Sequence, residues 1–313
     1  MKILIIGGTG FLGSAVHAAL LLRMEQRTDI SSISVRSRSN GLDLLDMSSV
    51  CYALMTTKPD IIFNCAAVVG SLHHIKSHHA EIFATNVQMM LNLYEGIRIE
   101  CPEALVINPI SNCAYPGGTT LQIEKDWLNG PVHESVMSYG NSKRALHTFS
   151  CCYNLQYGIR SKNVILPNMF GPGDSTDVNK VHALSGMIIR MLQAHRAKEL
   201  FFTIYGTGTP VREWGYVHDM AQALVMIAVS QASHLMYPIN VAQGCGHSIG
   251  SSAKEIARLI GYEGELRFDT SYADGDLIKV LDDTQFRSMY PQFLFTGHVD
   301  GLEKTIEYYR RAL

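Results

Sequence analysis

The sequence predicts an α/β fold in which a parallel sheet carries helices on both faces and is joined to a smaller second lobe. Residues 2–6 form a short apolar stretch that runs directly into a glycine-rich segment at 7–13. Further strand-like stretches follow at residues 33–36, 59–64, 104–108 and 162–166. Helical stretches lie between several of them, and this alternation is typical of βαβ units, whose strands pair in parallel. A chain of 313 residues can bury one large core or two closely joined cores.

The composition argues against several classes of protein. The chain is 47% hydrophobic and 17% charged, as in soluble globular proteins, and no apolar run approaches the length of a membrane span. A formal net charge of -2 gives no electrostatic reason to expect a nucleic acid or a membrane surface as partner. The seven cysteines are scattered without a C-x-x-C pair, so we expect neither a metal site nor a disulfide framework. The first residues do not resemble a signal peptide, and we expect a reduced, cytoplasmic protein.

The glycine-rich segment predicts a dinucleotide site. It has the pattern G-x-x-G-x-x-G, and it lies between the first strand and a helix expected over residues 14–23. Glycines let the backbone approach a pyrophosphate, and the helix N-terminus supplies amide donors and a positive dipole. An ordinary glycine turn is the alternative, but such a turn needs neither the strand nor the helix. These features indicate a Rossmann-type, doubly wound domain. The predicted binding residues are Gly7, Thr9, Gly10, Phe11, Leu12 and Gly13.

The end of the second strand favours NADP(H) as the cofactor. Enzymes that prefer NAD often carry an acid there, whereas this chain has Arg36 and Arg38 and no acid. Arginines suit a 2′-phosphate, and two exposed arginines without a ligand are the alternative. Asp46 is expected near the adenine, while Ala66 and Pro167, which follow later strands, are expected beside the cofactor.

The segment around Tyr139 and Lys143 predicts a catalytic pair. The two residues are four apart, so an α-helix places them on one face. A cation beside a phenol favours the phenolate, so we expect the pKa of Tyr139 to fall toward the working pH. A solvated surface pair is the alternative. Ser111 and Cys113 follow the strand at 104–108, and ligands gather at the carboxyl ends of parallel strands.

The rest of the chain predicts further helices, loops and strands. The histidine cluster His73, His74, His78 and His79 lacks acids and cysteines at ligand spacing, so we expect a substrate-facing loop there and not a metal site. Residues 117–137 are expected to form an irregular loop. We expect helices over residues 80–98, 139–157, 178–193, 219–232, 248–260 and 301–312. We expect the remaining strands over residues 201–205, 237–241, 266–269 and 278–281.

Strands and helices no longer alternate regularly after about residue 167. This change predicts that the chain has two parts, which do not fold as independent domains. We divide the chain into a cofactor-binding domain, residues 1–167, and a smaller α/β lobe, residues 168–313, that mainly binds substrate. No linker separates the two, so some segments of the second part are expected to return to the first domain.

Six of these residues together resemble the extended short-chain dehydrogenase/reductase superfamily, in which a Rossmann domain is paired with a small C-terminal substrate domain. They are Gly7, Gly10, Gly13, Ser111, Tyr139 and Lys143. Longer stretches narrow the resemblance to the GDP-L-fucose synthase family, whose members are 3,5-epimerase-4-reductases of GDP-4-keto-6-deoxymannose. These stretches lie at residues 36–46, 111–116, 168–172, 206–213 and 274–282. The resemblance extends from residue 1 to about residue 311.

This resemblance implies a role for each matching residue. Ser111, Tyr139 and Lys143 would form the reductase triad. Cys113 would be the base of epimerisation and His182 the acid. Four residues match positions that hold the GDP-sugar, namely Asn168, Arg190, Arg212 and Lys279. A homodimer is also implied, in which the helices at 80–98 and 139–157 pair with those of a second copy.

Departures from the family pattern leave the sugar open. Residues 68–71 read Val-Val-Gly-Ser where the family usually has Lys-Val-Gly-Gly. Asn112 stands where a second serine is common, and Tyr205 where a tryptophan is common. One alternative function is therefore a 4-keto-sugar reductase that does not epimerise, or that acts on a dideoxy or heptose nucleotide sugar. A non-catalytic, cofactor-sensing regulator is a further alternative, although a pure binder has no need of the triad.

Overall fold

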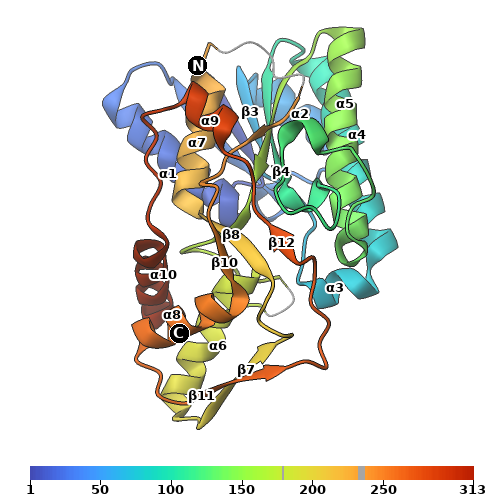
Figure 1. The fold of residues 1–313 in the computed structure, drawn as a ribbon. Coiled ribbons are helices and arrows are strands. Elements are labelled where there is room, and N and C mark those ends of the chain that lie inside the picture. Colours follow the sequence, from blue (N-terminus) through green and yellow to red (C-terminus); the bar gives the residue numbers. More distant parts are fainter. Residues whose placement is uncertain (178–179, 232–236) are drawn as a thin grey trace.

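A six-stranded parallel sheet forms the centre of the larger lobe (Figure 1). The computed structural model describes residues 1–177, 180–231 and 237–313, with every side chain except that of His73. The strand order is β2-β1-β3-β4-β5-β9, and the order reverses between β1 and β3. Ligands of such sheets bind at the carboxyl ends of the strands beside this reversal. The strands are β1 (Lys2–Ile6), β2 (Ser32–Arg36), β3 (Ile61–Asn64), β4 (Leu105–Ser111), β5 (Arg160–Leu166) and β9 (Ile239–Asn240).

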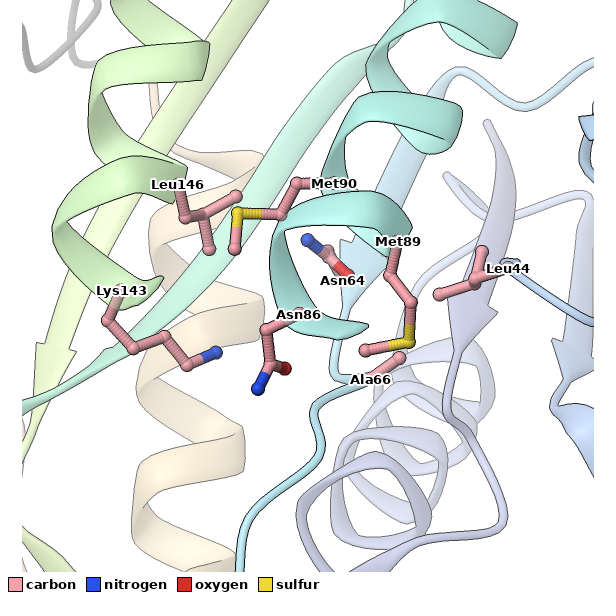
Figure 2. A pocket seen from close by; sticks show the side chains of 8 residues that line it. All are labelled: Leu44, Asn64, Ala66, Asn86, Met89, Met90, Lys143 and Leu146. Carbon is pink, nitrogen blue, oxygen red and sulfur yellow. The ribbon is translucent and has the colours of Figure 1, made fainter. Parts of the chain in front are cut away.

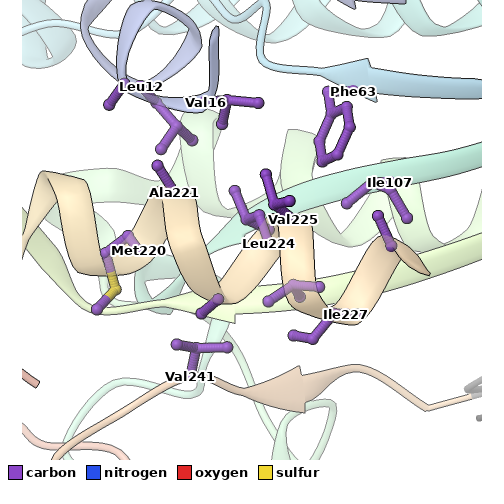
Figure 3. Packing of buried hydrophobic residues seen from close by; sticks show 14 of the residues in the cluster. Leu12, Val16, Phe63, Ile107, Met220, Ala221, Leu224, Val225, Ile227 and Val241 are labelled. Atoms are coloured by element: carbon purple, nitrogen blue, oxygen red, sulfur yellow. The ribbon is translucent and has the colours of Figure 1, made fainter. Parts of the chain in front are cut away.

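Helices α1 (Phe11–Gln26) and α7 (Val217–Val229) pack together on one face of this sheet. Figure 3 shows Leu12 and Val16 of α1 facing α7, with Phe63 and Ile107 of the central strands to one side. Helix α7 is buried over most of its surface, because it lies between α1 and the sheet. Helix α7 and β9 both come from the second half of the chain, so that half completes the core of the first.

Three helices cover the opposite face, and two of them cross at very close range. A Cβ atom on Gly96 of α4 would lie 2.7 Å from Cγ1 of Val50 in α2, so a larger residue at position 96 would push the helices apart. Helix α5 packs along α4 and carries the predicted catalytic pair (Figure 1). The bounds are α2 (Met47–Thr57), α4 (His79–Glu100) and α5 (Met137–Tyr157).

The smaller lobe has its own hydrophobic core and two small sheets. One sheet has the order β10-β8-β12, with β6 also paired to β8; the other consists of β7 and β11 in parallel. The helices are α6 (Ala183–Ala197), α8 (Ile249–Ile260) and α10 (His298–Ala312), whereas α9 (Thr284–Met289) packs against β9 and the core of the larger lobe (Figure 1). The strands are β6 (Asn168–Phe170), β7 (Phe201–Tyr205), β8 (Val211–Tyr216), β10 (Gly246–Ser248), β11 (Glu265–Asp269) and β12 (Ile278–Lys279).

Most of the predicted elements are confirmed, with shifts at their ends. Strands β1 and β7 have the predicted bounds. Helix α1 begins at Phe11 instead of residue 14, so Gly13, which packs against the Gly7 carbonyl, lies within its first turn. The helix expected over 178–193 begins only at Ala183, and residues 178–179 lie outside the described part of the chain. The helix expected over 219–232 ends at Val229, and residue 232 also lies outside the described part.

One prediction was wrong, and several elements were not predicted, among them helices α2 and α9 and strands β6 and β10. The histidine segment, expected as a loop, contains a short helix, α3 (Leu72–Ser77), because the Ser71 side chain accepts a hydrogen bond from the His74 N–H and caps it. Strand β8 was not predicted. Its sequence, Val-Arg-Glu-Trp-Gly-Tyr, lacks alternation because it buries charged as well as apolar side chains.

Candidate active site

The glycine loop lies directly against the backbone that follows β3. Gly7 has φ +72, and a Cβ atom there would lie 2.7 Å from the Ala66 nitrogen. A Cβ atom on Gly13 would lie 2.3 Å from the Gly7 carbonyl oxygen. Both positions therefore require glycine, and both line the reversal point of the sheet. The structure thus brings Ala66 and the glycine loop together, which is the cradle that a pyrophosphate requires.

The two arginines lie beside this loop. The Gly8 N–H donates to the Arg36 carbonyl, 3.2 Å away, and Thr9 Oγ1 donates to Ser37 Oγ at 2.9 Å. The Arg38 side chain is 83% exposed, and its Nε lies 3.7 Å from a carboxylate oxygen of Asp43. Such an exposed ion pair contributes little, so the guanidinium of Arg38 remains available to an anionic ligand.

A small cavity lies between Leu44 and α5, with Ala66 in its lining (Figure 2). Its ends are marked by Leu44 and by the ammonium of Lys143, and Ala66 lies between them. Asp46, expected near the adenine, is exposed and caps α2 by accepting the Ser48 N–H at 2.9 Å. The other lining residues are Asn64, Asn86, Met89, Met90 and Leu146.

Helix α5 is pressed against the turn that follows β4. A Cβ atom on Gly140 would lie 2.4 Å from the Cys113 carbonyl oxygen, so only glycine permits this approach. The contact holds Tyr139 near Cys113, and both pack against one apolar cluster. Ser111 Oγ accepts the Cys113 N–H at 3.2 Å, which leaves the hydroxyl proton of Ser111 free to be donated. The structure therefore gathers the predicted hydroxyl, thiol and phenol at one junction.

The pKa of Tyr139 does not move as expected. Burial raises the pKa of Tyr139, and the negative charge of a Cys113 thiolate would raise it further. Burial also lowers the pKa of Lys143 to about 8. The Lys143 Nζ lies 5.6 Å from the centre of the Tyr139 ring and donates to the Pro109 carbonyl at 3.3 Å. The cost of desolvating the phenolate outweighs the attraction of a cation that lies over the ring and not at the hydroxyl.

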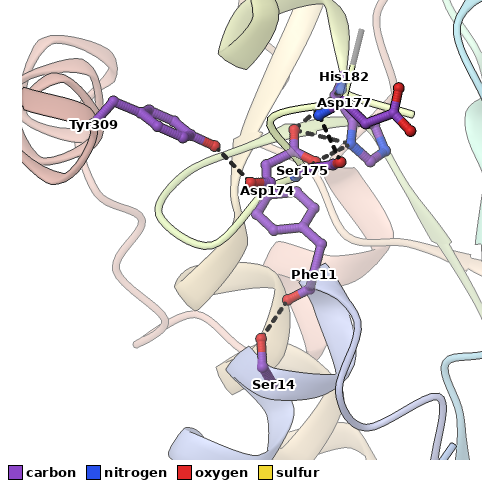
Figure 4. Close-up of polar contacts among 7 residues, drawn as sticks. All are labelled: Phe11, Ser14, Asp174, Ser175, Asp177, His182 and Tyr309. Atoms are coloured by element: carbon purple, nitrogen blue, oxygen red, sulfur yellow. Dashed lines mark hydrogen bonds and ion pairs between the residues drawn. The ribbon is translucent and has the colours of Figure 1, made fainter. Parts of the chain in front are cut away.

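His182 is held in place by an acid that the sequence analysis missed (Figure 4). Its Nδ1 lies 3.1 Å from both carboxylate oxygens of Asp174, and its ring centre lies 5.3 Å from that of Phe11. Asp174 ends the sequence Gly-Pro-Gly-Asp after β6, and its spacing of eight residues from His182 is not a helical spacing. The predicted acid thus contacts a residue of the glycine loop.

The four predicted sugar-binding residues occupy different places. Lys279 Nζ donates to Cys113 Sγ at 3.5 Å, and Lys279 pairs in register with Arg212. Asn168 Oδ1 accepts from Asn112 Nδ2 at 3.2 Å. Lys279, Arg212 and Asn168 thus belong to the Cys113 junction or to the strands beside it.

Arg190 and Pro167 contact other parts of the smaller lobe. The guanidinium of Arg190 packs between the rings of Phe202 and Tyr205, 4.9 and 4.6 Å from their centres, and donates to the Thr203 carbonyl. Arg190 is therefore anchored to β7. Pro167 follows β5, and its Cγ would lie 2.8 Å from a Cβ atom on Gly215.

The sequence profile of the NAD dependent epimerase/dehydratase family matches residues 3–242. The chain belongs to this family. It is 30% identical to the GDP-L-fucose synthase of Sinorhizobium fredii, with 92% of this chain and 89% of that protein covered. A crystal structure of a GDP-L-fucose synthetase from Naegleria fowleri bound to NADP has a TM-score of 0.84 and 26% identity, and covers 99% of this chain and 94% of that one.

A second solved structure extends the likeness of fold. A GDP-6-OMe-4-keto-L-xylo-heptose reductase from Campylobacter jejuni has a TM-score of 0.87 at 20% identity and covers 100% of this chain and 98% of that one. At that identity only the shared fold follows. Among the described residues, no helix has both the length and the apolar character that a membrane span requires.

Proposed function

We propose that this protein is an NADPH-dependent 3,5-epimerase and 4-reductase of a GDP-4-keto-6-deoxy sugar. The observation that carries the proposal is the junction of Ser111, Cys113 and Tyr139 at the carboxyl end of β4. The relatives named GDP-L-fucose synthase support the same reaction class. Intact thiol, phenol and hydroxyl groups favour an enzyme over a regulator that only senses a cofactor.

The thiol suits the epimerisation step. A 4-keto group acidifies the protons on carbons 3 and 5, because the resulting carbanion is an enolate. Cys113 would remove these protons, and the Ser111 hydroxyl would donate a hydrogen bond that stabilises the negative charge on the enolate oxygen. His182 would return a proton from the other side through the imidazole that Asp174 orients.

The phenol suits the reduction step. Burial keeps Tyr139 protonated, so it can donate its proton to the oxygen on carbon 4. The charge of Lys143 over the ring would then stabilise the phenolate that remains. NADPH, when bound, supplies the hydride. The glycine cradle with Ala66, the cavity that ends at Lys143, and Arg36 and Arg38 support the proposal that NADPH binds along this edge.

Two measurements test this function separately. Purified protein with GDP-4-keto-6-deoxymannose in D₂O, without NADPH, should incorporate deuterium at carbons 3 and 5. Addition of NADPH should then give the reduced, epimerised sugar. Reduction without any deuterium incorporation would favour the reductase that does not epimerise. If NADPH is consumed with a dideoxy or heptose nucleotide sugar but not with this sugar, the proposed substrate is wrong and the alternative sugar is the substrate.

The segment at residues 68–71 bears on which sugar the protein prefers. Asn86 fixes the segment at 68–71 by accepting the Val68 N–H at 2.9 Å and donating to the Val68 carbonyl at 2.8 Å. This segment departs from the family pattern and leads into α3, whose Leu72 Cδ1 lies 3.6 Å from the Cβ position of Gly275. A panel of GDP-sugars that differ at carbons 2 and 6 would identify the preferred one.

We further infer that two copies pair through α4 and α5, in a reducing cytoplasm. These helices lie side by side at one edge of the molecule (Figure 1) and expose several apolar side chains. They are Leu91, Ile99, Leu155 and Tyr157. A monomeric mass by light scattering across micromolar concentrations would contradict the dimer. We also propose that residues 1–167 mainly bind the cofactor and residues 168–313 mainly the sugar.

A further inference from the structure

Lys279 and Arg212 present two buried cations side by side on the small sheet. Strands β12 and β8 pair in parallel, with Lys279 directly in register with Arg212. Side chains in register on neighbouring strands point to the same face of a sheet. Lys279 is 5% exposed and Arg212 is 8% exposed, so both positive charges have been largely removed from water.

The ammonium of Lys279 ends at the thiol of Cys113. The donor and the sulfur are 3.5 Å apart, although the two residues are separated by 166 positions in the sequence. A buried ammonium is costly unless a negative group or several acceptors compensate it. Within the described ranges, no carboxylate lies within ion-pair distance of the Lys279 ammonium. The thiol of Cys113 is therefore the group that can provide the missing negative charge.

The other charged and titratable groups around Cys113 do not replace Lys279. Tyr139 is buried beside the thiol, and burial keeps it neutral. Arg212 is close enough to interact with Cys113, but Asp274 and Asp276 act on the same guanidinium. Their negative charges, together with that of a Cys113 thiolate, oppose the lowering of the pKa of Arg212 by burial. Lys279 is thus the cation that is directed at the sulfur itself.

We propose that Lys279 is a positioning residue that holds Cys113 as a thiolate before the sugar binds. Only one part of this inference rests on the proposed function, namely that the thiolate later removes a proton from the sugar. In that step an S–H bond forms and a C–H bond breaks. The electron pair of the C–H bond becomes the double bond of the enolate, and its negative charge goes to the carbonyl oxygen. Lys279 keeps its proton throughout.

The pH profile of alkylation tests this pair without any sugar. Iodoacetamide reacts with thiolates, so the rate at Cys113, followed by mass spectrometry across about pH 5 to 10, reports the thiolate fraction. In Lys279→Met we expect the midpoint to rise by about one pH unit and the rate at neutral pH to fall about tenfold. Lys279→Arg, which keeps the charge, should remain near the wild-type profile. A Lys279→Met profile that coincides with wild type would overturn the proposal.

Controls within the same protein separate charge from general loss of structure. Cys152 and Cys245 are exposed, and their profiles should be the same in all variants. Lys162→Met removes another buried lysine, one that donates to the carbonyls of Ile227 and Ser230, and it should leave the Cys113 profile unchanged. An equal shift in Lys162→Met would overturn the specific role of Lys279.

A comparison within the wild-type protein needs no variant. Cys113 must reach its alkylation midpoint at a lower pH than the exposed Cys245, and equal midpoints would overturn the proposal. The outcome is also independent of the reaction. The alkylation midpoint of Cys113 could rise as expected in Lys279→Met while the wild type shows no deuterium exchange. That result would contradict the proposed function but would support the role of Lys279 toward Cys113.

Discussion

His182 donates from Nδ1 to Asp174, whose carboxylate oxygens both lie 3.1 Å away (Figure 4). The backbone N–H of His182 donates to the same carboxylate, and the Asp174 side chain is only 2% exposed. A carboxylate in this position fixes the tautomer of the imidazole and stabilises the imidazolium when it forms. Nε2 is therefore the nitrogen that can exchange a proton with a ligand.

Asp174→Asn should weaken the acid of epimerisation while the reductase remains active. The amide cannot stabilise the imidazolium, so deuterium exchange into the sugar should fall about 10²-fold or more. Consumption of NADPH with the same sugar should change much less. Tyr309→Phe is the matched control, because the Tyr309 hydroxyl donates to the Asp174 backbone carbonyl and not to its carboxylate. Equal losses in the two variants would mean that Asp174 acts only through local structure.

Arg36→Ala should weaken the binding of NADPH far more than that of NADH. A lost hydrogen bond between a guanidinium and a phosphate corresponds to about a tenfold or larger rise in Kd. Titration of each cofactor by fluorescence measures both values. Arg27→Ala, in an exposed position at the other end of α1, should affect neither. Equal losses for NADPH and NADH in Arg36→Ala would contradict a contact with the 2′-phosphate.

His147 should make the stability of the protein sensitive to acid. It is 7% exposed, its Nδ1 accepts from Asn163 at 3.1 Å, and the Trp127 ring lies edge-on to it at 4.7 Å. Burial lowers the pKa of His147 to about 4, so its folded pKa lies below its unfolded value of about 6.5. The stability that the protein gains from keeping His147 neutral is therefore fully present above about pH 6.5. It is lost as the pH falls toward 4.

Urea unfolding across this pH range measures the effect. The difference in unfolding free energy between wild type and His147→Gln should shrink by on the order of 3 kcal/mol as the pH falls from about 6.5 to 4. A difference that does not change with pH would show that His147 titrates alike in both states.

The first half of the site could be predicted from the sequence because its signals are local. The glycine loop, the end of β2 and the spacing of Tyr139 and Lys143 each lie within about ten residues, and backbone geometry alone relates them. Gly140 lies between Tyr139 and Lys143, but the sequence does not show why a glycine is needed there. The need arises from the close contact with Cys113, which only the packing of α5 reveals.

The second half of the site could not be derived in the same way. The pairing of β12 with β8 brings Lys279 to Cys113, and that pairing joins short strands with no alternating pattern. Asp174 lies in a loop, at a distance from His182 that no periodicity marks. The pKa of Tyr139 was predicted in the wrong direction, because spacing along a helix gives the neighbour of a group but not its burial.

The two half-reactions should separate in the variants Cys113→Ser and Tyr139→Phe. A serine hydroxyl has nearly the size of the thiol but is far too weak an acid to ionise near neutral pH. Deuterium exchange at carbons 3 and 5 should therefore fall by about 10²- to 10⁴-fold in Cys113→Ser. Reduction of the unepimerised sugar should survive and give a product with the original stereochemistry.

Tyr139→Phe should show the opposite pattern. It removes the proton donor for the oxygen on carbon 4, so NADPH consumption should collapse, while some exchange persists through Cys113 and Ser111. Cys101→Ser is the control for thiol loss, because Cys101 follows α4 at the opposite end of β4 and burial raises its pKa to about 12. Mass spectrometry of the sugar, with absorbance of NADPH in parallel, follows both steps. If Cys113→Ser exchanges deuterium at the wild-type rate, the thiol is not the base and a reductase that does not epimerise becomes the better assignment.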